Sequence, residues 1–143
     1  MANIVPDSFK TDLLGGVFDF DSSGGSTFKL ALYSSLANFS TSTTAYTTTN
    51  EVSSSGTNYT AGGGTLTNNG VAVSSNIAFV DFADLTFSSV TLTAAGALIY
   101  KSSSNEAVLV LDFGGNKTAT NGDFVIQFPT ANSSNAIIRL GDA

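Results

Sequence analysis

The side chains of this chain that could do chemistry are mainly carboxylates and tyrosines. The sequence contains no His, no Cys and no Trp, and it carries five Lys or Arg against eleven Asp or Glu. Histidine proton transfer, thiolate chemistry and His or Cys metal ligation are therefore excluded. The chemistry that remains is acid–base catalysis by paired carboxylates, oxygen ligation of a hard cation, and stacking by tyrosine rings.

Asp81 and Asp84 are close in sequence, and Asp112 or Asp123 could join them in the folded chain. Two carboxylates that flank a glycosidic bond can hydrolyse it. However, acidic residues at strand ends are commonly solvated caps, and the sequence does not fix a separation between these four. We therefore favour caps and keep a carboxylate hydrolase as an alternative.

Residues 19–24, Asp-Phe-Asp-Ser-Ser-Gly, resemble the opening of a calcium-binding loop. A complete EF-hand loop needs a bidentate Glu at its twelfth position, which falls on Leu30, and flanking helices that are missing from this sequence. A strand that ends in an Asp-capped turn explains the segment better. We accordingly predict no metal and no other cofactor.

Two glycine-rich segments, residues 62–64 and 114–117, superficially resemble phosphate-binding loops. Neither has the Walker spacing, and neither is followed by a helix whose N-terminus would bind phosphate. We predict that these glycines serve turns or bulges.

The four tyrosines are the remaining candidates for ligand binding. Tyr33, Tyr46, Tyr59 and Tyr100 could stack on sugar rings, but tyrosine is equally suited to a half-buried position at an interface. A glycan-binding function stays open as an alternative.

Composition limits the partners. The net charge is −6 and the few basic residues are scattered, so we predict that the chain binds neither nucleic acid nor an anionic membrane. Hydrophobic residues make up 42% of the chain and charged residues only 11%, against roughly a quarter in an average domain. We infer that part of the exterior is covered by other subunits.

Hydrophobic spacing predicts a short helix at residues 6–14, followed only by β-strands. Apolar residues recur every four positions in the helix, Asp7 or Ser8 can cap its start, and two glycines can end it. Residues 34–58 are polar and Thr-rich, and we interpret them as a long ordered loop with one short turn of helix.

After residue 16 the apolar residues alternate with a period of two, which indicates half-buried strands. In residues 27–33, Phe28, Leu30 and Leu32 share one face. Alternating or apolar segments lie at residues 17–20, 27–33, 61–67, 71–73, 76–82, 85–87, 90–92, 94–101, 107–113, 123–128 and 136–140. We interpret them as about nine short strands of an all-β fold, an antiparallel β-sandwich or jelly roll. Residues 1–16 form an N-terminal arm or helix, and residues 17–143 form one domain.

Several blocks of the sequence together resemble a family of small virion structural proteins of tailed bacteriophages. The similarity runs over nearly the whole chain, through residues 8–15, 27–33, 44–52, 59–63, 97–100, 110–114 and 137–140. Since no block is a catalytic signature, the resemblance implies a role in a particle and not an enzyme. It implies a capsid decoration (cement) protein on the capsid exterior, made in the cytoplasm of the host bacterium. The alternative is a tail- or fibre-associated protein that binds a receptor or glycan.

The expected partners are the major capsid protein and further copies of the chain, in a homo-oligomer such as a trimer. The predicted contact residues are Ile4, Val5, Phe9 and Leu13 in the N-terminal segment and Leu36, Phe39 and Tyr46 in the long loop. On this basis, removal of residues 1–14 is expected to leave a folded domain that no longer binds capsids.

Overall fold

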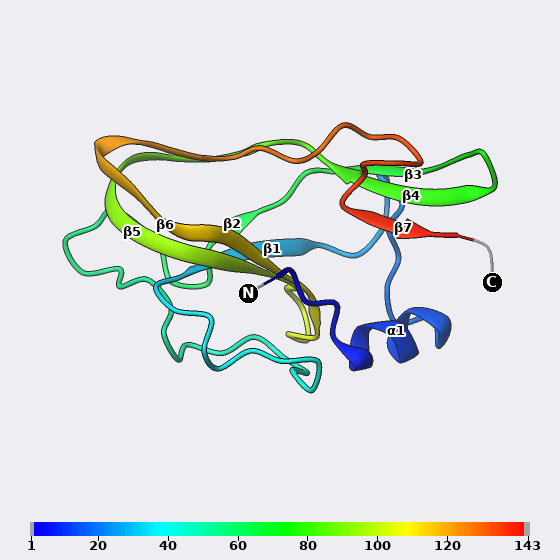
Figure 1. Cartoon of the computed structure of the whole chain (residues 1–143), viewed down its shortest axis with the longest axis horizontal. Coiled ribbons are helices and arrows are strands. Elements are labelled where there is room, and N and C mark those ends of the chain that lie inside the picture. Colours follow the sequence, from blue (N-terminus) through cyan, green and yellow to red (C-terminus); the bar gives the residue numbers. More distant parts are fainter. Residues whose placement is uncertain (1, 142–143) are drawn as a thin grey trace.

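Two antiparallel sheets and one short helix make up the computed structural model, which describes residues 2–141 (Figure 1). The elements are α1 (Asp7–Leu14), β1 (Phe28–Tyr33), β2 (Gly64–Thr65), β3 (Asn68–Ser74), β4 (Ile77–Phe82), β5 (Leu85–Lys101), β6 (Ala107–Ile126) and β7 (Ile138–Leu140). One sheet has the order β2-β1-β5-β6 and the other the order β3-β4-β7. The predicted all-β, sandwich-like fold with an N-terminal helix is confirmed.

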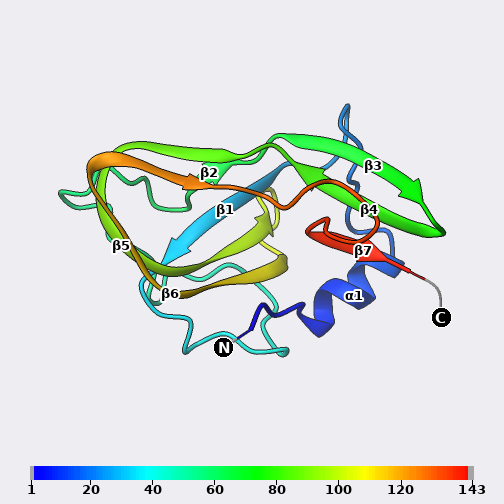
Figure 2. The ribbon, with the colours of Figure 1, turned by 45° about the horizontal axis from the view of Figure 1, so that its top comes forward.

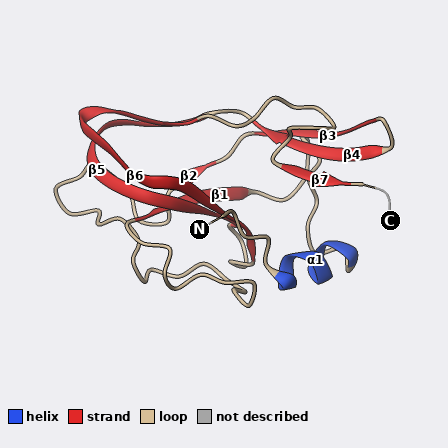
Figure 3. Ribbon diagram, in the orientation of Figure 1, coloured by secondary structure: helices blue, strands red, loops and turns tan. Residues whose placement is uncertain are grey.

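Strand β1 shows why the four-stranded sheet is buried on both faces. Leu30 and Leu32 point into the main core between the two layers, whereas Ala31 and Tyr33 belong to a second, smaller core on the opposite face. This is the alternation that the sequence predicted. The second core exists because the long loop after β1 covers that face of the sheet, as Figure 3 shows in tan.

Phenylalanine rings fill the main core below the three-stranded sheet. Phe28 stacks on Phe20 with ring centroids 4.7 Å apart, and Phe82 meets Phe28 edge-on at 5.8 Å. Helix α1 contributes Phe9, which lies 5.1 Å from Phe18. The segment that carries Phe18 and Phe20 was predicted as a strand. It forms none, because it crosses between α1 and β1 without a neighbouring strand and is held by its buried rings.

Helix α1 begins after Pro6, and no side chain caps its first turn. The predicted cap is therefore wrong. The Ser8 hydroxyl donates instead to the carbonyl oxygen of Thr43 in the long loop, at 3.1 Å. At the other end the prediction holds, since the Gly15 N–H donates to the carbonyl oxygen of Thr11 at 2.9 Å and the helix stops there.

The described residues form seven strands instead of about nine, because β5 and β6 are long. They run for 17 and 20 residues and pair as one ribbon that bends over at the left of Figure 1, so its two halves lie in different layers (Figures 1 and 2). Ala94 pairs with Lys117, but Gly96 pairs with Asp112. The residues between Asp112 and Lys117 therefore bulge out of the ladder, and such bulges sharpen strand bending.

The long loop between β1 and β2 is held against the four-stranded sheet by backbone hydrogen bonds. The Val52 N–H donates to the Leu32 carbonyl oxygen and the Tyr46 N–H to the Asn105 carbonyl oxygen, both at 2.9 Å. Between β1 and β2 the loop contains turns and not the predicted helical turn. Leu36 inserts beside Gly96, where a Cβ atom would lie 2.5 Å from a Leu36 methyl carbon.

Two glycines in this loop allow a matched test of its packing. Gly63 has φ 80° and Gly56 has φ 73°, but a Cβ at Gly63 would lie 1.8 Å from the Leu30 carbonyl oxygen, whereas nothing lies within 4 Å of one at Gly56. We expect Gly56→Ala to cost about 1 kcal/mol for the left-handed backbone. Gly63→Ala should lower the free energy of unfolding, measured with urea, by about a further 3 kcal/mol. Equal losses in the two variants would contradict the close approach of this loop to β1.

Candidate functional site

All four tyrosines converge near one carboxylate, that of Glu51. Tyr33 ends β1, Tyr100 lies near the end of β5, and Tyr46 and Tyr59 come from the long loop. The hydroxyl of Tyr59 donates to Glu51 Oε1 at 2.8 Å, and the hydroxyl of Tyr46 donates to Glu51 Oε2 at 2.6 Å. We call these five residues the tyrosine cluster.

Backbone groups complete the tyrosine cluster. The Gly62 N–H donates to Glu51 Oε1 at 2.6 Å, and the Tyr100 hydroxyl donates to the Gly62 carbonyl oxygen at 2.7 Å. The Tyr33 hydroxyl donates to the Thr47 carbonyl oxygen at 2.6 Å. The cluster therefore ties both ends of the long loop to β1 and β5.

The tyrosine rings pack against other parts of the chain. Burial raises the pKa of all four hydroxyls above the usual value near 10, and the Glu51 carboxylate raises it further. Tyr33, Tyr59 and Tyr100 are buried, and the Tyr46 ring stacks on that of Tyr100 with centroids 4.6 Å apart. The hypothesis that these rings form a sugar platform is therefore wrong.

The calcium-like segment at residues 19–24 forms a turn. Asp19 Oδ1 accepts the N–H of Asp21 at 2.9 Å, and the Asp19 N–H donates to the Ser26 hydroxyl at 3.0 Å. This is the Asp-capped turn that the sequence favoured. Within residues 2–141, no three His, Cys, Asp or Glu side chains gather closely enough to hold a metal ion.

The four carboxylates considered for hydrolysis each accept a hydrogen bond within the fold. The donors are the side-chain amide of Asn69 for Asp81 and the N–H groups of Phe128 for Asp84, of Gly114 for Asp112 and of Ser89 for Asp123. The Gly114–Asp112 bond is a local turn bond, whereas the other three bonds join segments that are far apart in sequence.

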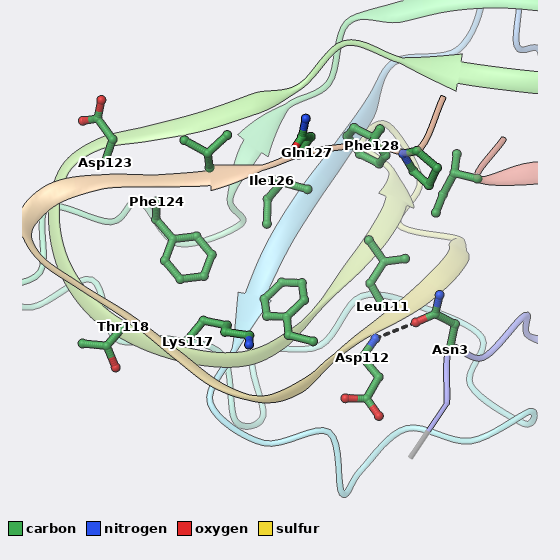
Figure 4. A pocket seen from close by; sticks show the side chains of 14 residues that line it. Asn3, Leu111, Asp112, Lys117, Thr118, Asp123, Phe124, Ile126, Gln127 and Phe128 are labelled. Atoms are coloured by element: carbon green, nitrogen blue, oxygen red, sulfur yellow. Dashed lines mark hydrogen bonds between the residues drawn. The ribbon is translucent and has the colours of Figure 1, made fainter. Parts of the chain in front are cut away.

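Asp112 and Asp123 do line one groove, of about 540 Å³, on the open side of the sandwich. Figure 4 shows them on opposite sides of it, with both carboxylates directed away from the groove. Phe124 and Ile126 point into the groove from the upper layer, and Lys117 lies along its floor. The groove therefore offers apolar and mixed polar contacts but no paired carboxylates.

The glycine-rich segments are also structural. Gly63 is needed for the close approach to Leu30, and Gly114 and Gly115 lie in the bulge of β6. Each segment is followed by strand and not by a helix N-terminus, so neither provides the phosphate-binding geometry of a Walker loop.

The most unusual surface of the molecule is apolar and lies at one end. Among residues 2–141, six large hydrophobic side chains are largely exposed, and five of them, all except Val125, lie around α1, β3 and β7. Leu14 is 83% exposed and Val73 is 72% exposed. We call this surface the apolar end; it consists of Val5, Leu13, Leu14, Val71, Val73, Ile138 and Leu140.

Strand register places much of the apolar end on one face of the three-stranded sheet. Val73 pairs with Ala78, which in turn pairs with Leu140 on β7. The neighbouring row consists of Val71, Val80 and Ile138. Directly paired residues project to the same side of a sheet, so the two rows form one continuous apolar strip.

Two hollows join this strip to α1, which lies beside β7 in Figures 1 and 2. The larger, which we call the α1–β7 groove, has a volume of about 600 Å³ and includes Val5, Leu14 and Leu140. The smaller is almost purely apolar, and both contain Leu13 and Ile138. Among residues 2–141, the charged residues that line these hollows are the cations Lys10 and Arg139.

The structure separates the seven predicted contact residues into two groups. Phe9, Leu36 and Phe39 are buried within the chain's own cores, and Ile4 and Tyr46 pack against the second core. Val5 and Leu13 lie in the α1–β7 groove. Sequence reasoning missed the part of the apolar end on β3 and β7, although the alternation of Val71 and Val73 in a polar segment was a usable signal.

The protein is thus a sandwich-like β-protein with an exposed apolar surface at one end. Comparisons of the chain with family models, with curated proteins and with solved structures found no match. In the part of the chain that the structure describes, no helix is long and apolar enough to cross a membrane.

Proposed function

We propose that this chain is a non-enzymatic structural protein that docks onto the capsid of a tailed bacteriophage and stabilises the shell from outside. The observation that carries the proposal is the apolar end, which gathers five of the six largely exposed large hydrophobics of residues 2–141. Contiguous exposed apolar surface commonly marks an interaction site. The choice of a capsid as partner comes from the sequence resemblance to virion proteins.

The charges of the α1–β7 groove support docking to a protein surface. The chain has a net charge of −6, yet the charged residues that line this groove are Arg139 and Lys10, and Lys10 pairs with Asp7 at 2.9 Å. An apolar centre with the Arg139 cation at its rim can approach a capsid subunit that presents apolar and acidic groups. Modest affinity at each site is sufficient, because a shell offers many copies of the site.

Leu14 provides a sharp test, since its exposed side chain can be changed without disturbing the core. We expect Leu14→Lys to weaken binding to matched capsids that lack the protein by about 10-fold or more. Val125→Lys is the control, because Val125 is also exposed but lies on β6 in the other groove. Binding would be measured by co-sedimentation with capsids, and unchanged binding of Leu14→Lys would refute docking through this groove.

This substitution is a better test than removal of residues 1–14. Phe9 is buried against Phe18 and Phe20, and Ile4 exchanges two backbone hydrogen bonds of 2.9 Å with Val110. The truncated chain would therefore lose part of its core as well as its contact surface, so a loss of binding would not identify the cause.

A second candidate function rests on the groove in Figure 4. Apolar side chains such as Phe124 and Ile126, together with Lys117 and Gln127, line this groove and give it the mixed character of a ligand site. On a tail or fibre, the chain would then bind a receptor or glycan. Binding of the isolated protein to a glycan array, lost in Lys117→Ala but kept in Leu14→Lys, would favour this function.

A further inference from the structure

We propose that two copies of this chain pair through the outer edge of β3, in antiparallel orientation, to form a two-fold dimer with one continuous six-stranded sheet. Strand β3 is the terminal strand of its sheet, so one row of its backbone N–H and C=O groups has no strand partner. Figure 2 shows it along the outer margin of the molecule. An unpaired strand edge is a template for a strand of another chain.

The edge of β3 lacks the features that usually prevent such pairing. Residues 71–74 contain no Pro and no charged residue. Their ladder with β4 is regular, since the one register shift lies between Asn68 and Gly70. All four are exposed. Another segment comes close at Gly70, where an added Cβ would lie 3.5 Å from the side chain of Ser22. The free edge is therefore at residues 71–74.

Charge favours a second copy as the occupant of this edge. Two chains of net charge −6 repel each other, so self-association requires contact where carboxylates are absent. Residues 68–80, which include all of β3 and its turn to β4, carry no charge. This is a surface on which two identical acidic chains can meet.

The apolar side chains set the register of the pairing. An antiparallel pair centred on Ala72 places Val71 of each copy opposite Val73 of the other copy, so two Val71–Val73 pairs form. Directly opposed residues share a face, so this register keeps all four valines on one side, whereas a one-residue slip would put the two apolar strips on opposite faces. The dimer thus joins the two apolar strips and presents two α1–β7 grooves.

The size of the contact predicts its strength. A short strand pair with four valines falls at the low end of specific interfaces, below about 1,200 Å² in total. We expect a dissociation constant in the micromolar range, about 1–50 μM. This inference goes beyond capsid docking: it uses Val71 and Val73 of the apolar end and leaves Leu14 and the α1–β7 groove free.

Sedimentation velocity at about 100 μM protein tests the dimer, a concentration chosen to exceed the expected constant. We expect a dimer for the unaltered chain and for Leu14→Lys and Val125→Lys. Val73→Lys should raise the dissociation constant about 100-fold, because each dimer then carries two buried lysines. Val73 is mostly exposed in the single chain, so its fold should be unaffected, as circular dichroism would show. A monomer for the unaltered chain, or a dissociation constant of Val73→Lys that a concentration series shows to be unchanged, would overturn the proposal.

A cross-link tests the register, and it is unambiguous because the chain has no native Cys. Ala72→Cys should form a disulfide-linked dimer on mild oxidation, because residues opposed across a strand pair have Cα atoms within disulfide range. Ser54→Cys, in an exposed part of the long loop, is the control. Equal cross-linking of the two variants would show random collision and contradict the pairing. If the unaltered chain forms the dimer but does not bind capsids, the proposed function is contradicted and the dimer is still supported.

Discussion

Glu51→Ala is expected to lower the free energy of unfolding by about 3–4 kcal/mol, a large part of the stability of a domain of this size. The Glu51 carboxylate accepts hydrogen bonds from the hydroxyls of Tyr46 and Tyr59 and from the Gly62 N–H. Alanine leaves all three donors without their acceptor, and hydrogen bonds to a charged group are worth about 1.5–3 kcal/mol each. Because Glu51 is partly exposed, water replaces some of this loss.

Two further variants make the Glu51 prediction specific. Glu51→Gln keeps one acceptor oxygen and should cost about 1–2 kcal/mol. Glu106 is the only other Glu of the chain, and its carboxylate accepts a hydrogen bond from the hydroxyl of Ser104. Glu106→Ala should therefore cost less than about 1 kcal/mol. Urea unfolding that showed equal losses for Glu51→Ala and Glu106→Ala would contradict the role of the tyrosine cluster.

The second large effect is loss of stability at alkaline pH. The folded chain raises the pKa of all four tyrosine hydroxyls, so between the unfolded value near 10 and the higher folded values the folded chain binds more protons than the unfolded chain. Stability is then complete below about pH 10 and falls as the pH rises above it. The well-buried Tyr33 and Tyr59 each remove up to about 1.4 kcal/mol per pH unit and the more exposed Tyr46 removes less, so we expect unfolding above about pH 10.

The alkaline transition can be followed by two signals at once. Circular dichroism reports loss of the sheets, and ultraviolet absorbance reports tyrosinate, with no Trp in the chain to interfere. We expect the two curves to coincide, because the tyrosines ionise only when the cluster opens. Tyr46→Phe should reduce by one the number of protons that the chain releases when it unfolds at alkaline pH. Tyrosinate that formed near pH 10 in a chain with intact sheets would contradict the buried cluster.

The sequence was sufficient for the fold class because the alternation of apolar residues is strong in short segments. Phe28, Leu30 and Leu32 lie on the predicted face of β1. The lengths of β5 and β6 could not be predicted, because Gly114 and Gly115 have the local signature of a turn but form a bulge within one strand. A bulge and a turn differ in whether the ladder continues beyond them, which depends on residues far along the chain.

A local pattern was also insufficient to tell which of the predicted contact residues lie on the surface. Leu36 and Phe39 are isolated apolar residues in a polar loop, a pattern that suits an interface and a loop folded onto its own sheet equally well. The structure shows the second arrangement. The tyrosine cluster was missed because Glu51 is distant in sequence from Tyr33 and Tyr100, which only the pairing of β1 with β5 brings together.

The most direct test of the account is to count copies of this protein on a particle. Purified protein would be mixed with matched phage particles that lack it, and the bound copies per particle would be counted by quantitative gel analysis and electron microscopy. A capsid decoration protein should bind in hundreds of copies, spread over the shell, and should increase the resistance of the shell to heat. A handful of copies, or binding at a single tail vertex, would contradict capsid decoration and favour the receptor-binding alternative.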